Sequence, residues 1–150
     1  MTARLRLVAF VLVSLGLGAC APASVTRRAH GHTFEGRFVS PKAYEEGFLA
    51  GLAEAEGDLS RAELHLHRAL RADPSSGDLW SRLALVTCRR GGSPEALFAR
   101  AEREERDYVP TYERWGACAE LRGDPSRAEA LRRRARALEG AGAIGSGTRE

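Results

Sequence analysis

The chain has 150 residues, of which 43% are hydrophobic and 29% are charged, so it has room for one folded domain with short appendages. Its formal charge is +3, but Arg4 and Arg6 lie in the first segment. The remaining 21 basic and 20 acidic residues leave a net charge of +1. This near balance argues against a strongly basic, nucleic-acid-binding surface, and we expect no nucleic-acid partner.

The first segment has the pattern of an export signal. The basic residues Arg4 and Arg6 precede an uncharged, mostly apolar run from Leu7 to Leu17. A helix of this length rises only about 16 Å, which is well short of the ~30 Å hydrocarbon core of a bilayer. The run therefore predicts a signal peptide rather than a permanent membrane span.

The end of this run, Leu17-Gly18-Ala19-Cys20, resembles the lipobox of bacterial lipoproteins. The resemblance implies that residues 1–19 are removed and that Cys20 becomes the first mature residue, which carries acyl chains that anchor the protein to a membrane. Ala21 follows the cysteine, and this is similar to lipoproteins destined for the outer membrane, facing the periplasm. The alternative is ordinary secretory cleavage after Ala21-Pro22-Ala23, which would discard Cys20.

Residues 20–40 read as the lipidated cysteine followed by a tether. The segment contains Pro22 and Gly31 and shows no helical period. Phe34 and Phe38 alternate with polar residues, which indicates an extended piece lying on the first helix.

The next feature is a seven-residue motif that occurs in two nearly identical copies, at residues 57–63 and 123–129, with a partial copy at residues 91–96. The glycines that open these copies are Gly57, Gly91 and Gly123, spaced by 34 and then 32 residues. A repeat of this length with helical flanks is typical of an array of stacked helical hairpins, in which each unit buries its apolar face against the next.

Three hairpins are predicted in the order of the chain. The first runs from Pro41 to Glu56 and from Asp58 to just before Pro74, the second through Leu79 to Gly91 and from Ser93-Pro94 into the charged run 100–107, and the third from about Pro110 to Gly123 and from Asp124-Pro125 to Leu138. Each glycine is expected to close a first helix in the left-handed conformation, and the following Asp or Ser to cap the second helix. Ala62, Ala96 and Ala128 are expected at close helix contacts, and the glycine-rich residues 139–150 to be disordered.

These hairpins resemble tetratricopeptide repeats. The second hairpin carries the resemblance at Trp80, Leu83, Ala84, Gly91 and Ala96, and the third at Tyr112, Trp115, Gly116, Gly123, Ala128 and Ala135. The resemblance covers residues 41–138 and implies an all-α domain, a short right-handed solenoid of about three hairpins. A generic helical bundle is the alternative fold.

The family places its ligand groove on the first helices of the hairpins. Carried over to this sequence, the partner-binding positions are Tyr44, Glu54, Ser81, Leu85, Arg89, Glu113, Ala117 and Glu120. The resemblance implies that this groove takes an extended or helical peptide of a protein partner.

The sequence gives little indication of catalysis. His65 and His67 lie two residues apart on a predicted helix and cannot grip one ion, while His30 and His32 lack a third ligand, so no metal and no cofactor are expected. No phosphate-binding glycine loop or nucleophile motif occurs, and we expect no enzyme.

Two other features of the sequence each allow two interpretations. Cys88 and Cys118 either form a disulfide or, as the slightly favoured interpretation, pack as buried free thiols. Arg132, Arg133, Arg134 and Arg136 are either solvated or form a patch for anionic lipid headgroups or cell-wall polymers.

Together these patterns predict a lipid-anchored, non-enzymatic adaptor of the bacterial cell envelope that holds a peptide or protein, for example during assembly of an envelope machine. The alternative is a structural subunit that self-associates or stabilises a complex through its repeat ends, where Leu131 and Leu138 offer an apolar edge.

Overall fold

The computed structural model describes residues 24–29, 32–37 and 39–145, which contain two strands and six helices. In chain order these are β1 (Ser24–Ala29), β2 (His32–Arg37), α2 (Pro41–Ala55), α3 (Leu59–Ala72), α4 (Gly77–Arg89), α5 (Glu95–Glu104), α6 (Val109–Leu121) and α7 (Pro125–Gly145). The chain divides into two compact units between Phe38 and Val39. The predicted signal peptide and Cys20 lie outside the described residues.

The first unit contains an antiparallel hairpin of β1 and β2, in which Ser24 pairs with Arg37 and Ala29 pairs with His32. The extended piece expected around Phe34 is therefore one strand of a two-stranded sheet. Sequence reasoning missed its partner β1, because only Val25 and Thr26 in that strand are β-branched. The expected contact between this segment and the first helix stays a prediction.

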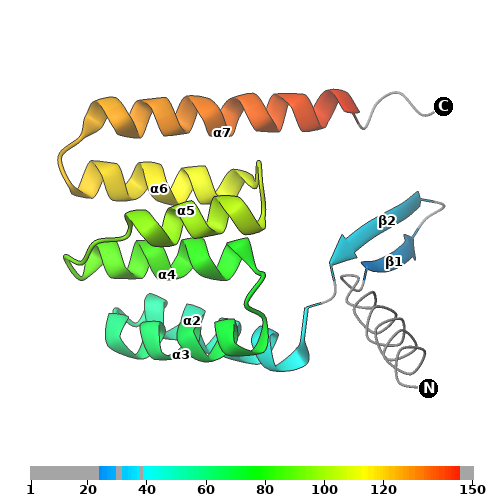
Figure 1. The fold of residues 1–150 in the computed structure, drawn as a ribbon, viewed down its shortest axis with the longest axis horizontal. Helices are drawn as coiled ribbons and strands as arrows, with labels where there is room; N and C mark the ends of the chain where they lie inside the picture. Colours follow the sequence, from blue (N-terminus) through cyan, green and yellow to red (C-terminus); the bar gives the residue numbers. More distant parts are fainter. Residues whose placement is uncertain (1–23, 30–31, 38, 146–150) are drawn as a thin grey trace, which may run out of the picture. The chain divides into compact units, whose positions relative to one another are not determined.

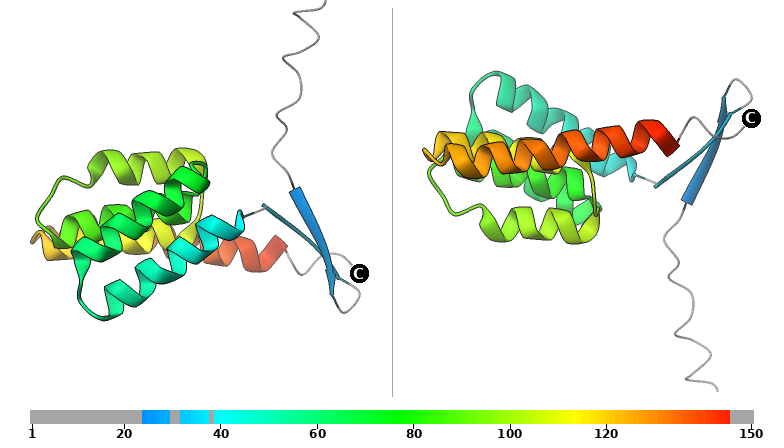
Figure 2. Two further views of the ribbon diagram at one scale, coloured as in Figure 1. Left: turned by 90° about the horizontal axis from the view of Figure 1, so that it is seen from below. Right: turned by 90° about the horizontal axis from the view of Figure 1, so that it is seen from above.

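The second unit is all-α and consists of three helical hairpins, α2–α3, α4–α5 and α6–α7 (Figure 1). α4 packs against both α3 and α6, whereas α5 contacts α6 only slightly. In both views of Figure 2, α2 and α5 lie on opposite sides of the stack. We call α2, α4 and α6 the A row and α3, α5 and α7 the B row. The prediction of an all-α array of helical hairpins is confirmed.

The turns inside the hairpins follow the predicted chemistry. Gly57, Gly91 and Gly123 have φ angles of 77°, 79° and 75°, the left-handed conformation that a glycine adopts without steric cost. The Asp58 and Asp124 carboxylates then accept hydrogen bonds of 2.9 and 3.0 Å from backbone amides three residues further on. These caps satisfy free amides at the start of α3 and α7.

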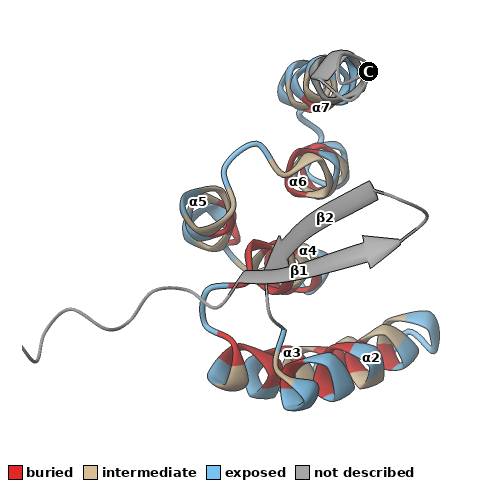
Figure 3. Cartoon of the chain, turned by 90° about the vertical axis from the view of Figure 1, so that its right-hand side faces the viewer, coloured by how far each residue is buried: buried red, intermediate tan, exposed pale blue. Residues whose placement is uncertain are grey.

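Small side chains let the helices of the first hairpin approach each other closely. The buried alanines of this hairpin are Ala43, Ala50, Ala53, Ala62 and Ala69. Larger side chains, including Leu66 and Leu83, fill the space between the first hairpin and α4. Figure 3 shows the buried positions.

The expectation of a close contact at Ala96 is wrong, although Ala62 and Ala128 are fully buried as predicted. Ala96 is exposed because α5 turns Pro94 and Phe98, four residues apart, toward the core instead. The buried residues Pro94, Phe98 and Ala101 have the same spacing as Ala62, Leu66 and Ala69, so Pro94 takes the place of the alanine in the middle hairpin.

Cys88 of α4 and Cys118 of α6 form a disulfide, with their Cα atoms 6.0 Å apart. The favoured interpretation of two free thiols was therefore wrong. The two residues lie 30 positions apart in sequence, and only the packing of α4 against α6 brings them within bonding distance.

The last helix is longer than predicted. α7 continues to Gly145, seven residues beyond Leu138, so the helix includes part of the expected disordered tail 139–150. The glycines in this stretch each weaken a helix by about 1 kcal/mol, but no proline interrupts it and alanine is the strongest helix former. Residues 146–150 lie outside the described residues.

Candidate functional site

Three large apolar side chains form a stripe on the surface of α2. Tyr44, Phe48 and Leu52 lie one helical turn apart and are 72%, 60% and 45% exposed. Large apolar residues of a helix ordinarily face the core. In α2 the alanines make the contact with α3 instead, and the stripe faces the opposite way.

The direction of this apolar stripe follows from the neighbours of α2. Its buried Glu46 bonds to α3, and a Cβ added at Gly47 would touch Leu79 and Arg82 of α4. Phe48 is two residues from Glu46, so its side chain points roughly 200° around the helix from the contact with α3, and it is 60% exposed. The apolar stripe therefore lies on the surface of the A row that points away from the B row, which is where a groove between hairpins is expected.

A guanidinium ties α4 to α2 beside this stripe. Arg82 donates 2.9 Å to the Gly47 carbonyl and 2.6 Å to the Glu54 carboxylate. A Cβ at Gly51 would lie only 3.4 Å from the same guanidinium, so the glycine leaves it room. Glu54, predicted to contact a partner, is therefore already engaged in holding the first two hairpins together.

A second polar network joins α4 to α6. Arg114 lies 2.8 Å from Asp78 and donates 2.6 Å to the Ser81 hydroxyl, and the Tyr108 hydroxyl donates 3.2 Å to Asp78. Burial and the nearby Asp78 carboxylate raise the pKa of Tyr108, so its hydroxyl stays protonated as a donor. Ser81 is fully buried, so its predicted role as a partner contact was wrong.

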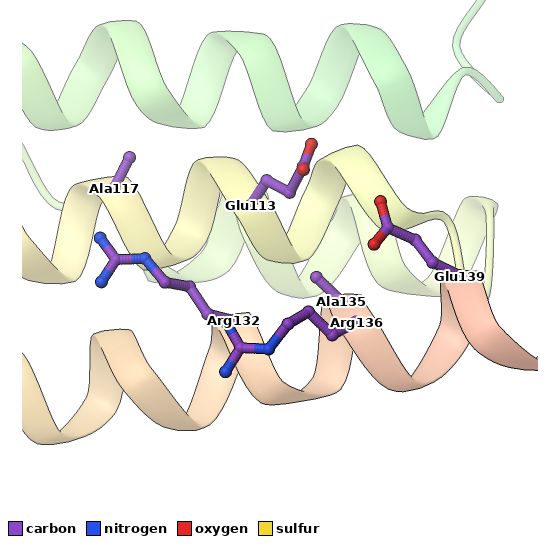
Figure 4. A pocket seen from close by; sticks show the side chains of 6 residues that line it. All are labelled: Glu113, Ala117, Arg132, Ala135, Arg136 and Glu139. Carbon is purple, nitrogen blue, oxygen red and sulfur yellow. The ribbon is translucent and has the colours of Figure 1, made fainter.

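The A row ends in a pocket of about 290 Å³ between α6 and α7. Figure 4 shows its lining side chains, Glu113, Ala117, Arg132, Ala135, Arg136 and Glu139. Arg132 pairs with Glu120 and Arg136 lies 2.8 Å from Glu129. Within the described residues Glu113 and Glu139 have no such partner, so the pocket keeps two free carboxylates beside two neutralised guanidiniums.

The structure brings together some of the predicted groove residues. Glu113 and Ala117 share the α6–α7 pocket, and Glu120 is joined to it through Arg132. On α4, Leu85 is half-buried and Arg89 is exposed, with no ion pair among the described residues.

Four further residues of the apolar stripe and the α6–α7 pocket were not predicted as partner contacts: Phe48, Leu52, Arg132 and Arg136. The spacing of Tyr44, Phe48 and Leu52 by four residues was the available signal for the apolar stripe.

The two helical histidines have different surroundings. His67 is exposed, whereas His65 is largely buried, with its Nδ1 2.7 Å from the Glu46 carboxylate. Hydrogen bonding by His65 first, and by Lys42 second, lowers the pKa of Glu46. This pair is an internal link between α2 and α3, away from the groove face.

The described part of the chain has neither a candidate membrane span nor a candidate metal cluster. No helix there combines the length and apolar character that crossing a membrane requires. Nor do those residues contain a group of three or more His, Cys, Asp or Glu side chains placed to hold a metal ion.

Comparisons with known proteins agree with this geometry. Residues 48–86 match the sequence profile of the tetratricopeptide repeat family. The chain has the fold of tetratricopeptide-repeat domains. No curated protein matches the chain.

Solved structures with this fold include the first tetratricopeptide-repeat domain of Spaghetti (RPAP3) bound to the HSP90 peptide SRMEEVD, with a TM-score of 0.61, 22% identity, and coverage of 68% of this chain and 85% of that one. The TPR2B domain of yeast Sti1 in a pHsp70 complex gives a TM-score of 0.62, 17% identity, and coverage of 71% and 87%. MamA gives 0.56, 18% identity, and coverage of 68% of this chain and 61% of that one.

Proposed function

We propose that this tetratricopeptide-repeat protein is a lipid-anchored, non-enzymatic adaptor of the bacterial cell envelope. Its groove holds a peptide or segment of a partner protein, and the acyl chains on Cys20 keep the complex at a membrane, which we take to be the outer membrane facing the periplasm. Holding such a partner suits the assembly of an envelope machine.

The observation that carries this proposal is the apolar stripe on α2. Three large side chains on one helix face remain exposed while the alanines of the same helix form the core. Contiguous exposed apolar surface on a soluble domain is a mark of a binding surface, because leaving it in water costs free energy that a partner recovers. One protein with this fold is described bound to an HSP90 peptide, and another in a complex with pHsp70.

The groove has chemically different parts that suit one ligand. The apolar stripe offers anchors on α2, Arg89 offers a cation on α4, and Glu113 with Glu139 offers carboxylates at the α6–α7 pocket. A partner peptide with apolar side chains for α2 and polar ones for α4 and α6 matches this order. Such a short groove favours modest affinity, since few side chains are desolvated on binding.

Two observations support the proposed location in the cell envelope. Leu17-Gly18-Ala19-Cys20 resembles a lipobox. The Cys88–Cys118 disulfide suits an oxidising compartment, because cytosolic thiols are kept reduced. Metabolic labelling with a palmitate analogue tests the anchor: we expect label on the parent chain and none on Cys20→Ser. Equal labelling of both chains contradicts the anchor.

Photo-crosslinking in intact envelopes tests the groove. A photoreactive residue at Phe48 is expected to give a discrete adduct, whereas the same residue at Leu64 is not. Leu64 is a matched control because it is 48% exposed on α3, in the B row. Adducts of equal yield at both positions, or at neither, overturn the groove assignment.

Substitutions in purified protein give a second measure. Phe48→Ser and Arg89→Glu should each weaken capture of the crosslinked partner, while Leu64→Ser should not. Both groove side chains are exposed, so the helicity and melting temperature of the variants should stay close to those of the parent. Unchanged capture by Phe48→Ser contradicts the proposal.

The alternative of self-association through the repeat ends has less support. Leu131 and Leu138, which were expected to form an apolar edge, are half-buried on α7. We expect light scattering on the soluble Ala21–Glu150 chain to give the mass of a monomer. A dimer abolished by a Leu138→Ser substitution establishes the alternative instead.

A further inference from the structure

A second cavity, of about 340 Å³, lies outside the groove. It is formed by the end of α5, the loop that follows it, and α7, and its lining residues are Glu102, Arg103, Arg106, Asp107 and Arg134. Arg134 lies two residues from Arg132 on α7, which places its side chain roughly 200° around the helix from the groove pocket. The two cavities therefore use different faces of α7.

Both carboxylates of this cavity are already engaged. Glu102 accepts a 2.9 Å hydrogen bond from the Tyr112 hydroxyl, and Asp107 lies 2.6 Å from Arg134. Burial and the hydrogen bond to Glu102 raise the pKa of Tyr112, so the phenol remains a donor to this carboxylate. The Arg134 guanidinium also lies 5.8 Å from the centre of the Tyr112 ring, which holds it in place.

The remaining charge in the cavity is positive. Among the described residues Arg103 and Arg106 have no ion-pair partner, and both are exposed at the cavity. The nearby Glu104 carboxylate is paired with Arg100 at 2.6 Å, and Glu105 also has a partner. Two free guanidiniums thus line a hollow in which each acidic neighbour is already engaged.

In the arginine cluster of the last helix, Arg133, Arg134 and Arg136 are exposed, which agrees with the interpretation of solvated side chains. Arg132, Arg133, Arg134 and Arg136 each lie within ion-pair distance of a carboxylate, so they offer little free charge. An anion entering the α5–α7 cavity meets unpaired guanidiniums instead, which bind oxyanions through charge-assisted and often bidentate hydrogen bonds.

We propose that the α5–α7 cavity binds a phosphate group, with Arg103 and Arg106 as its ligands and Arg134 as a third, internally paired cation beside them. The group belongs either to free phosphate or to a phosphorylated lipid headgroup, since both present the same oxyanion. This site is separate from the proposed peptide groove and does not depend on it.

Inorganic phosphate is the first probe. Added to the full chain in detergent, it should give saturable amide shifts in residues 103–107 by NMR, with sodium chloride of equal ionic strength as the reference. Arg103→Gln with Arg106→Gln should weaken phosphate binding roughly tenfold. Shifts that do not saturate, or that chloride reproduces, overturn the proposal.

A matched variant separates a site from bulk charge. Arg68 and Arg71 of α3 are also exposed without an ion pair among the described residues, so Arg68→Gln with Arg71→Gln removes the same charge elsewhere. This control should bind phosphate as tightly as the parent. An equal loss in both double variants shows a general charge effect and overturns the site.

Vesicles distinguish the two sources of phosphate. The unlipidated Cys20→Ser chain is sedimented with vesicles of phosphatidylglycerol or of phosphatidylcholine. Binding to phosphatidylglycerol alone, lost in the Arg103→Gln/Arg106→Gln variant, supports the site and assigns it to a headgroup. Saturable binding of inorganic phosphate without vesicle binding supports the site and assigns it to soluble phosphate groups.

Discussion

The two packed regions of the array are stabilised in different ways. The aliphatic cluster, between the first hairpin and α4, consists of many small contributions: Ala43, Ala50, Ala53, Ala62, Leu66, Ala69, Leu70, Leu79, Leu83 and Val86. The stapled cluster, around α4, α5 and α6, has only four buried members: Ala84, Cys88, Phe98 and Cys118. It compensates with a disulfide and with the stacking of Phe98 on Trp115, whose ring centres lie 5.1 Å apart.

This difference indicates how the helices that form the proposed groove are held against one another. The aliphatic cluster spreads its stability over close helix contacts, so no single side chain dominates it. The stapled cluster concentrates stability in two links: the disulfide fixes α4 against α6, and the aromatic stack joins α5 to α6. Single substitutions should therefore lower the free energy of unfolding more in the stapled cluster than in the aliphatic cluster.

Phe98→Ala should have the largest effect. The ring is fully buried and stacks on Trp115, so its removal leaves a cavity and should lower the free energy of unfolding by about 3–5 kcal/mol. Urea unfolding followed by circular dichroism measures this loss. A loss below about 1 kcal/mol would show that the cluster collapses around the gap and that the aromatic stack is dispensable.

Removal of the disulfide should come next. Cys88→Ser with Cys118→Ser opens a loop of 30 residues, and the entropy gained by the unfolded chain corresponds to about 3–4 kcal/mol. The unfolding midpoint of the parent should fall to that of the double variant when a reductant is added. The double variant itself should not respond to the reductant, and a response there would mean that the effect lies elsewhere.

Local features of this fold could be predicted from the sequence, and features of distant packing could not. Gly57, Gly91 and Gly123 and the caps that follow them act within a few residues, so their spacing was enough to place the hairpins. The disulfide and the bond from Arg82 to Gly47 join residues 30 and 35 positions apart, and they exist only because the hairpins stack. No spacing rule along the chain encodes that approach.

The groove was predictable only in part for a similar reason. An apolar residue on a helix predicts burial, and Phe48 and Leu52 would ordinarily define the core face of α2. In this protein Ala50 and Ala53 define it, since small side chains permit closer helix contact than large ones. The contact with α3 decides which face of α2 is buried, and the residue pattern of α2 alone does not reveal that contact.

Glu46→Gln tests the polar link within the aliphatic region. Hydrogen bonding by His65 and Lys42 lowers the pKa of Glu46 below its ordinary value of 4.5, so the ionised carboxylate stabilises the fold. This stability is fully present above pH 4.5 and is lost as the pH falls through the lowered pKa. The parent should therefore have a higher urea midpoint of unfolding than Glu46→Gln at pH 6. This gap between the two midpoints should narrow below pH 4.5.

The titration has an internal control. Lys42 on α2 and His65 on α3 are the charged or titratable groups that contact Glu46 in the described structure. Lys42→Met should reduce the gap less than His65→Leu, because the bond to His65 is the larger cause of the lowered pKa. A gap that is independent of pH would indicate that packing, rather than ionisation, distinguishes glutamate from glutamine here.

The smallest effect is expected in the turns, and it bears on where the regional difference resides. Gly57 and Gly123 close the first and third hairpins with φ near +75°, and a Cβ at either position would meet no atom within 4 Å. Alanine therefore costs only backbone strain, about 1 kcal/mol at each site, and asparagine should cost less. Melting curves of Gly57→Ala and Gly123→Ala should show equal losses. An unequal loss would place part of the difference between the regions in their turns, whereas equal losses leave it to the disulfide and the aromatic stack.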